Sequence, residues 1–288
     1  MVISLRLTYR PPYDWPQLLA FLARRAITGV EHIEADRYAR TVRTASGTAV
    51  VEVAPAHDAD ALELSIRGGE PSDLLPLQSQ VRRMFDLAAD PARIAAVLSR
   101  DPLLRSHTAR YPGLRIAGTW DVFESGVRAI VGQRVSVSAG RTILNRLIER
   151  VGERCGQDRA GLDRLFPTAA AVATADFEGL GLPEARAAAL REFASAVRDG
   201  ALPQVLTQLR GVGAWTAGYI ALRGLGDPDA FPSGDLVLRQ QAAGGAVALD
   251  QRTLEKRAEM WRPFRGYAVF QLWRAATTDR NPSARPSA

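Results

Sequence analysis

The apolar and polar positions of the first ninety residues predict short strands and helices in turn. Four segments alternate between apolar and polar side chains, as strands with one buried face do: residues 3–7, 38–44, 51–53 and 62–66. Glycine and proline separate these segments. Apolar residues at helical spacing follow Asp14 and again follow Leu74. We therefore expect residues 1–90 to form a small N-terminal α/β domain, an antiparallel sheet backed by helices.

From about residue 91 the spacing of apolar residues is helical almost to the end of the chain. Asp121 and Glu124 stand as in a capping box and predict that a helix starts there. Further helices are expected over residues 143–148, 169–175, 185–197 and 253–261. The tail from residue 280 is rich in proline, serine and arginine, and we expect it to be disordered at least over 283–288. The whole pattern predicts an α+β protein with a small sheet followed by mainly helical domains.

A sharp turn at Gly211-Val212-Gly213 interrupts the helical region. A short apolar helix containing Val205 is expected before the turn, and a second helix after it. Glycines permit a tight turn that side chains would obstruct. The second helix then begins with unpaired N–H groups at the positive end of its dipole, so a phosphate can bind at Gly211, Gly213 and Ala214 without a basic side chain. An ordinary pair of helices joined by a glycine turn fits the same residues.

A loop rich in glycine and proline follows, and it ends in Asp235. Another helix is expected to start at Leu236, so Asp235 is well placed as its N-cap. A cap also fixes the position of its carboxylate, which suits a catalytic group. From these residues alone, capping by itself and capping combined with catalysis both stay open.

The charge of the chain favours a polyanionic partner. The 288 residues carry a formal net charge of +6, and 36 of the 37 basic residues are arginine. Arginine suits bidentate phosphate contacts, although biased codon usage gives the same excess. The single cysteine, Cys155, excludes an internal disulfide and a four-cysteine zinc or iron–sulfur site, and the three histidines are scattered. No apolar run is long enough to span a bilayer, and the first residues predict a strand instead of a secretion signal.

Several separated segments make the chain similar to bacterial 3-methyladenine DNA glycosylase II, the AlkA type of the helix-hairpin-helix DNA glycosylase superfamily. The similar segments are Pro-Pro-Tyr-Asp-Trp15, Phe-Leu-Ala-Arg-Arg25, Tyr-Pro-Gly-Leu-Arg115, Phe123 to Ser136, Trp215-Thr-Ala-Gly-Tyr219, Asp235, and Arg265 to Trp273. The resemblance implies an N-terminal α/β domain at 1–90, a central helical domain with the hairpin at 116–230, and a second helical domain formed by 91–115 and 231–282. It places the active-site cleft between the two helical domains.

The resemblance also implies a catalytic residue and a base pocket. The catalytic carboxylate of the family falls on Asp235. The aromatic residues of the pocket fall on Phe21, Trp215, Tyr219 and Trp273. Trp215 and Tyr219 are four residues apart, so they share one face of a helix. Packing in a hydrophobic core is the alternative for each of these aromatic side chains.

Base excision requires that the nucleotide is flipped out and that its N-glycosidic bond is broken. An alkylated purine such as 3-methyladenine carries positive charge, so it leaves readily and electron-rich aromatic faces hold it well. The sugar then passes through an oxocarbenium-like state that one buried carboxylate, Asp235, can stabilise. We expect an open, weakly polar pocket with broad selectivity for damaged purines.

Further assignments follow from the resemblance. Relatives that also cut the DNA backbone carry a lysine two residues after the second hairpin glycine. This chain has Trp215 there and its only lysine is Lys256, so we expect a monofunctional enzyme that leaves an abasic site. Gln133 and Arg134 fall where the family inserts a wedge beside the flipped base, and a solvated arginine at a helix end is the alternative for Arg134. The hairpin of the family binds an alkali cation, Na⁺ or K⁺, through backbone carbonyls at positions that match Thr207, Leu209 and Val212.

The leading hypothesis is a monofunctional glycosylase that excises alkylated bases from double-stranded DNA. We expect it to act as a monomer in the bacterial cytoplasm, at the nucleoid, with no required cofactor and no membrane. A non-catalytic helix-hairpin-helix protein that binds lesions or DNA structure is one alternative, but phosphate binding has no use for Asp235. A glycosylase for oxidised or deaminated bases is another, which the tryptophan-rich pocket and the missing lysine disfavour.

Overall fold

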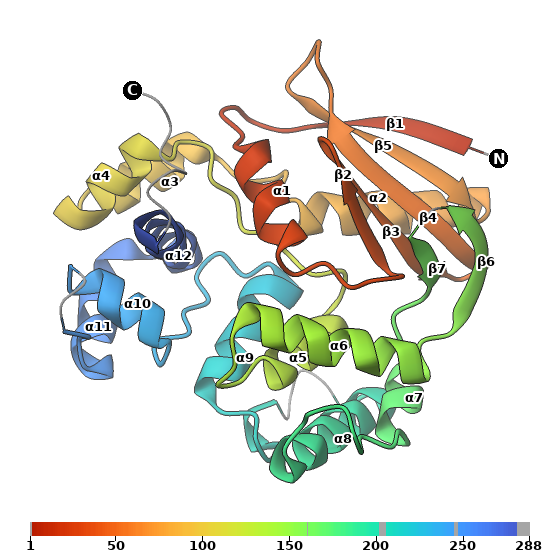
Figure 1. Cartoon of the computed structure of the whole chain (residues 1–288). Helices are drawn as coiled ribbons and strands as arrows, with labels where there is room; N and C mark the ends of the chain where they lie inside the picture. The colour runs from red at the N-terminus through yellow and green to blue at the C-terminus, as the bar shows by residue number, and fades with distance from the viewer. Residues whose placement is uncertain (1, 160, 202–205, 245–246, 281–288) are drawn as a thin grey trace.

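The structure is a computed structural model that describes residues 2–159, 161–201, 206–244 and 247–280. Its N-terminal part is a five-stranded antiparallel sheet of order β1-β5-β4-β3-β2 (Figure 1). The strands are β1 (Val2–Thr8), β2 (Glu31–Glu34), β3 (Arg37–Thr44), β4 (Gly47–Pro55) and β5 (Ala61–Gly68). The sheet confirms the expected antiparallel arrangement. The sequence pattern did not show β2, because Glu31 stands at a buried position where an apolar residue is expected.

Helices make up most of the remaining chain, which confirms the α+β class. They are α1 (Trp15–Ala23), α2 (Leu74–Met84), α3 (Pro91–Leu98), α4 (Pro102–Arg110), α5 (Val122–Val131), α6 (Val137–Val151), α7 (Ala169–Ala173), α8 (Glu184–Arg198), α9 (Ala214–Ile220), α10 (Leu236–Ala242), α11 (Gln251–Ala258) and α12 (Arg265–Arg280). Helix α9 continues as a turn of π-helix over Ala221–Leu225. Short 3₁₀ turns occupy Pro71–Asp73, Leu206–Gln208 and Glu259–Trp261. None of the described helices combines the length and the apolar character needed to cross a membrane.

A β-hairpin interrupts the helical region, and here our expectation of helices throughout is wrong. Strands β6 (Arg154–Arg159) and β7 (Leu162–Arg164) pair between α6 and α7 and lie beside the N-terminal sheet (Figure 1). Leu162 forms a bridge to Gly29 and is buried against Ala39 and Val50. The hairpin sequence is polar, and its apolar contacts come from a distant part of the chain, so local periodicity gives no sign of it.

Two hydrophobic cores hold these elements together. One core is continuous from the N-terminal sheet and α1 to α10, α11 and α12. The other lies among α5, α6, α8, the glycine turn and α9. Asp101, at the start of α4, is buried and accepts two hydrogen bonds of 2.7 Å from Arg257 and one of 2.9 Å from Trp261. Residues of the 91–115 segment therefore pack with α11, although the domain boundaries stay a prediction.

The expected capping box at the start of α5 is only half formed. The Asp121 carboxylate accepts the Glu124 backbone N–H at 2.7 Å, as an N-cap does. The Glu124 side chain does not cap in return but turns into a buried ion-pair network with Arg40 and Arg128. A side chain with the right spacing for a cap is thus used for tertiary contact. The expected disordered tail at 283–288 lies outside the described residues.

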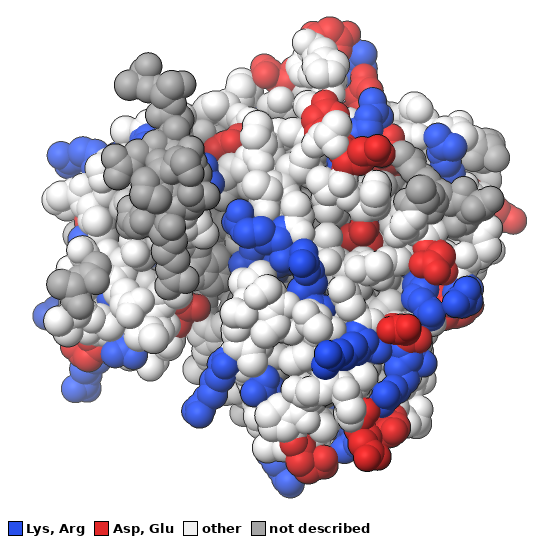
Figure 2. Space-filling model, in the orientation of Figure 1, with Lys and Arg blue, Asp and Glu red and all other residues white. Residues whose placement is uncertain are grey.

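Charge is unevenly distributed over the surface. A band of basic side chains crosses the middle of the face shown in Figure 2, in the region where Figure 1 places α1 and α6. Acidic side chains on this face lie mainly beside the band and toward the sheet. The basic band therefore borders the junction between the N-terminal and helical parts.

Candidate active site

Asp235 is the N-cap of α10, and its carboxylate faces a cavity of about 330 Å³. Its Oδ1 accepts the Leu238 backbone N–H at 3.0 Å and, at 3.5 Å, the indole N–H of Trp273. Its Oδ2 accepts the indole N–H of Trp215 at 3.1 Å. No ion pair joins Asp235 to a basic side chain of the described residues. The carboxylate is thus oriented by neutral donors and is not paired with a basic side chain of the described residues, so it can interact with a ligand in the cavity.

Hydrogen bonds with residues of α11 hold the loop before Asp235 in place. The Ser233 hydroxyl donates to Glu255 Oε1 at 2.6 Å. The Gln251 side-chain amide donates to both of them, at 3.0 Å to Ser233 and 2.8 Å to Glu255. Hydrogen bonds from Ser233 and Gln251 lower the pKa of Glu255 below its usual value, so it remains an acceptor at neutral pH. The sequence did not single out these residues, because they meet only when α11 folds against the loop.

Three of the expected pocket residues form one aromatic wall of the cavity. The rings of Trp215 and Tyr219, one turn apart on α9, stack with their centroids 5.5 Å apart. Trp273 on α12 lies 6.2 Å from Tyr219. All three line the cavity, whose volume is in the range of small-molecule sites. The structure therefore brings together Asp235, at the start of α10, and three aromatic rings from α9 and α12.

Phe21 lies one layer behind this wall. Its side chain is only 4% exposed, and it is absent from the residues that line the cavity. One neighbour is Trp273, stacked at a centroid distance of 6.5 Å. The guanidinium of Arg25 lies 3.7 Å from the centroid of the Phe21 ring. In this structure Phe21 supports Trp273 and Arg25, and a base in the cavity would meet those two side chains.

The surface that lines the cavity is mainly apolar, as expected, but four arginines also line it, which the sequence analysis did not predict: Arg25, Arg128, Arg141 and Arg223. The pKa of Arg25 is lowered to about 9, mainly by burial; Tyr219 opposes this shift, and Arg223, Arg24 and Arg128 add to it. Two of them, Arg25 and Arg128, stand in the segments that carry the family resemblance. Each stands on a helix or beside one among apolar neighbours, so nothing local distinguished it from an arginine on a solvated face.

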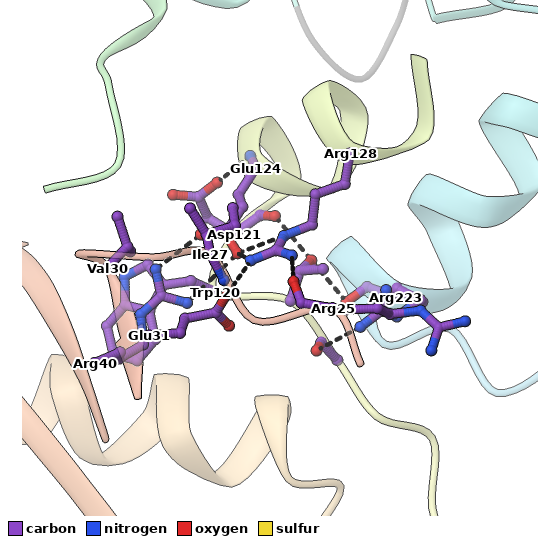
Figure 3. Close-up of polar contacts among 12 residues, drawn as sticks. Arg25, Ile27, Val30, Glu31, Arg40, Trp120, Asp121, Glu124, Arg128 and Arg223 are labelled. Atoms are coloured by element: carbon purple, nitrogen blue, oxygen red, sulfur yellow. Dashed lines mark hydrogen bonds and ion pairs between the residues drawn. The ribbon is translucent and has the colours of Figure 1, made fainter. Parts of the chain in front are cut away.

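Arg128 connects the cavity to the N-terminal sheet (Figure 3). It donates to Glu124 at 2.9 Å and to Glu31 at 2.5 Å, and Glu124 also accepts from Arg40 at 2.8 Å. All four side chains are buried. Arg128 also donates at 2.8 Å to the backbone oxygen of Arg25. The ion-pair network thus fixes the end of α1, and with it the Arg25 side of the cavity, against the sheet and α5.

The glycine turn has the sharp geometry expected from its sequence. Gly211 has φ +76°, and a Cβ placed there would lie 2.6 Å from the Cβ of Ala189. Gly213 is the N-cap of α9, and a Cβ there would meet nothing within 4 Å. Ala214 begins α9 and is exposed. The element before the turn is a 3₁₀ turn at Leu206–Gln208, and Val205 lies outside the described residues.

The two candidate wedge residues are placed differently. The Gln133 side chain donates to the Gly211 carbonyl at 2.8 Å and to the Thr216 hydroxyl at 2.9 Å, so it ties the α5–α6 loop to the glycine turn. Arg134 is exposed with φ +56°, in the left-handed region that arginine seldom adopts. Its side chain makes no hydrogen bond or ion pair with a described residue. Of the two, only Arg134 is placed to reach beyond the protein surface.

The candidate cation ligands lie in the turn before α9. The Leu209 carbonyl accepts the Val212 N–H at 3.1 Å. A carbonyl oxygen has a second lone pair, so this bond leaves it able to bind a cation. Thr207 lies in the 3₁₀ turn beside it. Cation binding at Thr207, Leu209 and Val212 stays a prediction. Elsewhere in the described part of the chain, no three His, Cys, Asp or Glu side chains come together as a metal site.

The fold is that of the helix-hairpin-helix DNA glycosylases. It is similar to the solved 3-methyladenine DNA-glycosylase from Archaeoglobus fulgidus, with a TM-score of 0.80 and 21% identity over 98% of this chain and 99% of that one. It also resembles an 8-oxoguanine glycosylase/lyase from Clostridium acetobutylicum in complex with double-stranded DNA, with a TM-score of 0.66 and 20% identity over 88% of this chain and all of that one. Identities this low establish the fold and leave the substrate open.

Sequence comparison identifies the family within the helix-hairpin-helix DNA glycosylases to which the chain belongs. Residues 4–121 match the family model described as the AlkA N-terminal domain. DNA-3-methyladenine glycosylase 2 of Escherichia coli is 34% identical over 93% of this chain and 95% of its own length. The chain therefore belongs to the AlkA family. A probable bifunctional transcriptional activator/DNA repair enzyme AlkA of Mycobacterium tuberculosis is 36% identical over 94% of this chain. The chain spans about half (56%) of that protein.

Proposed function

We propose that this chain is a monofunctional DNA glycosylase that excises 3-methyladenine and related methylpurines from double-stranded DNA. One observation carries the proposal most directly. The Asp235 carboxylate stands in a cavity beside three aromatic rings and is held by two indole N–H groups. A planar base fits against the rings, and its sugar is then close to a fixed negative charge.

Asp235 would act on the sugar. As the bond between C1′ and the base nitrogen breaks, positive charge develops at C1′ and the ring oxygen. A carboxylate that is already oriented stabilises this charge without reorganising at the moment of reaction. The indole groups of Trp215 and Trp273 and the Leu238 N–H supply that orientation. Water then adds to C1′, and the products are the free base and an abasic site.

DNA would be held by the turn and the basic face. The N–H groups of Gly211, Gly213 and Ala214 are the proposed phosphate site, since the open space at Gly213 leaves room for a DNA backbone. Arg134 is the proposed wedge, because it is exposed on the loop whose neighbours line the cavity. An alkali cation at the turn would strengthen the phosphate contact by its charge. We expect one protein molecule to act on one lesion.

A lyase step through a hairpin lysine is not part of the proposal. The position two residues after Gly213 is Trp215, whose indole N–H donates a hydrogen bond to Asp235. Lys256 is exposed on α11 and is not among the residues that line the cavity. An enzyme without an amine nucleophile should leave the abasic strand intact. Electrophoresis of the reacted strand without alkali treatment would reveal any cleavage.

The decisive variant is Asp235→Asn. Asparagine is also a good N-cap, so the fold should keep its stability while the charge is lost. We expect release of methylated purines to fall by about 10²- to 10³-fold, the usual effect of removing an electrostatic stabiliser. The measurement is chromatography of bases released from methylated DNA under single-turnover conditions, with DNA binding measured in parallel. Asp250→Asn is the matched control, because Asp250 caps α11 in the same way at an exposed position.

Each alternative function gives a different chromatogram. Undiminished release by Asp235→Asn would remove the catalytic role from this residue. No release from any substrate by excess wild-type protein, with DNA binding retained, would support a lesion-binding protein. Preferred release of bases from oxidised or uracil-containing DNA would show that the substrate is an oxidised or deaminated base.

A further inference from the structure

One face of α6 borders the active-site cavity. The residues of this helix that line the cavity are Val137, Gly140, Arg141 and Leu144. Their spacing places them on one side of the helix. Leu144 is only 5% exposed and Val137 is 46% exposed, so this face runs from the interior of the cavity to its mouth. Arg141 lies one helical turn from each of them and is exposed, so its side chain leaves α6 at the mouth of the cavity.

Arg141 differs from the other three arginines that line the cavity. The charge of Arg128 is balanced by two buried glutamates, and Arg223 donates to two backbone carbonyls. Arg25 donates to the backbone oxygen of Phe21 at 3.2 Å. The side chain of Arg141 makes no hydrogen bond or ion pair with a described residue. A guanidinium has five N–H donors, so Arg141 presents a full set of them, with its charge, beside the cavity.

Opposite charges lie on different elements around the cavity. Among the described residues that line it, Asp235 is the only acidic one, and it stands at the start of α10 beside the aromatic wall. Arg141 stands on α6, which contributes no ring to that wall. A nucleotide with its base against the wall and its sugar beside Asp235 carries a phosphodiester group on each side of the sugar. Asp235 repels these phosphates and Arg141 attracts them.

We propose that Arg141 binds a phosphate group of the flipped nucleotide and so holds that nucleotide outside the duplex. The inference rests on the proposed function, because it requires that a nucleotide is flipped toward this cavity. It deepens that function by naming a residue that binds the DNA backbone at the lesion itself. The glycine turn would bind a strand whether or not it is damaged, whereas Arg141 gains its phosphate only when the nucleotide has left the stack.

The chemistry of the arginine side chain and the charge of this face both fit a phosphate. The planar guanidinium matches two phosphate oxygens at once, and such charge-assisted hydrogen bonds are stronger than neutral ones. Helix α6 also lies where the basic band crosses the surface (Figures 1 and 2), so the field there attracts a DNA strand. An arginine that only serves this general attraction would contribute equally to damaged and undamaged DNA. Binding that depends on the lesion is therefore the property that Arg141 should control.

The experiment compares two duplexes that differ at one position. One is undamaged, and the other carries a tetrahydrofuran residue, whose sugar can flip but has no base to release. Fluorescence anisotropy gives the Kd of each duplex for the wild type and for Arg141→Gln over a range of salt concentrations. We expect Arg141→Gln to bind the tetrahydrofuran duplex about 5- to 20-fold more weakly and the undamaged duplex less than about twofold more weakly. The slope of log Kd against log salt should fall by about 0.9 for the tetrahydrofuran duplex only.

Two variants complete the test. Arg141→Lys keeps the charge but loses the planar fork, so it should recover part of the affinity for the tetrahydrofuran duplex. Arg146→Gln is the matched control, because Arg146 is exposed on the same helix but is not among the residues that line the cavity. It should leave the ratio of the two Kd values as it is in the wild type.

The outcomes separate this inference from the proposed function. Equal weakening of both duplexes by Arg141→Gln, or no weakening of either, overturns the role of Arg141. So does a wild-type protein that binds the two duplexes equally. None of these binding results depends on base release. A wild-type protein that releases no base from methylated DNA would instead remove the proposed function.

Discussion

Glu124 offers a quantitative test of how the sheet supports the active site. Its carboxylate lies between Arg40 and Arg128, and the side chains of Glu124 and Arg40 are each only 1% exposed. At an effective dielectric constant of about 20, unit charges about 4 Å apart attract each other by about 4 kcal/mol. Replacement by glutamine removes the charge and leaves two buried arginines with one carboxylate, Glu31. We expect Glu124→Gln to lose about 3–5 kcal/mol of unfolding free energy.

The pKa of Glu124 gives an independent expectation of the same size. Burial alone would raise it, but Arg40 and Arg128 outweigh burial and lower it from 4.5 to about 2. A lowered carboxylate pKa means that the stabilisation is fully present above pH 4.5 and is lost as the pH falls toward 2. Linkage then assigns about 3 kcal/mol to this group. The variant should therefore approach wild-type stability at low pH and differ most at neutral pH.

Urea denaturation followed by tryptophan fluorescence measures the difference, with the same slope expected for both proteins. Glu184→Gln is the matched control, because Glu184 and its partner Arg191 are exposed and such pairs contribute about 0–1 kcal/mol. A loss below about 1 kcal/mol for Glu124→Gln would refute the reasoning. Since Arg128 also holds the Arg25 backbone, we expect the rate of base release to fall in the folded variant as well.

Three further outcomes are expected. Gly211→Ala should lose about 1–3 kcal/mol of unfolding free energy in a urea titration, because Gly211 has a positive φ and a Cβ there would clash with Ala189. Gly213→Ala should keep its stability but bind DNA more weakly in a fluorescence anisotropy titration. Equal effects of the two changes would contradict the proposed phosphate site. Burial raises the pKa of Asp86 to about 6, so the folded state keeps a proton that the unfolded state has lost, and stability should fall as the pH rises from about 4 to 6. Asp86→Asn should remove that part of the slope, and an unchanged slope would show that other groups cause it. Arg134→Ala should slow base release from duplex DNA without changing the thermal midpoint, and an unchanged rate would exclude a wedge role.

Local signals were enough to predict that Asp235 caps a helix and that Trp215 and Tyr219 share a helix face. A glycine turn, a cap residue and a pair of aromatic residues one turn apart each follow rules that act over a few residues. Trp215 and Tyr219 indeed share a face of α9, and Asp235 indeed caps α10. Trp273 was placed by the resemblance alone, since its position beside Asp235 depends on how α12 packs.

The missed features all depend on contacts between distant segments. Strand β2 was missed because Glu31 stands at one of its buried positions. This buried carboxylate is stabilised by hydrogen bonds from Tyr38 and Arg128, which the local sequence does not reveal. The arginines that line the cavity could not be predicted, because an arginine on a helix shows no local sign of facing inward. Phe21 matches the family pattern, but only the packing of Arg25 over its ring shows that it stands behind the cavity wall. Sequence spacing thus predicted which residues share a helix, and packing decided what they face.

The strand pair β6 and β7 has a consequence for how the chain acquires its shape. Ala39 and Val50 form a small apolar cluster with Leu162, which also forms a bridge to Gly29. During synthesis the N-terminal sheet leaves the ribosome first. Ala39 and Val50 then lack their contact with Leu162 until the β6–β7 hairpin has been synthesised. A truncated version that begins after residue 90 would lack the residues that contact Leu162 and one of the two arginines, Arg40, that pair with Glu124. We therefore expect that the helical part of the chain does not fold without the N-terminal sheet.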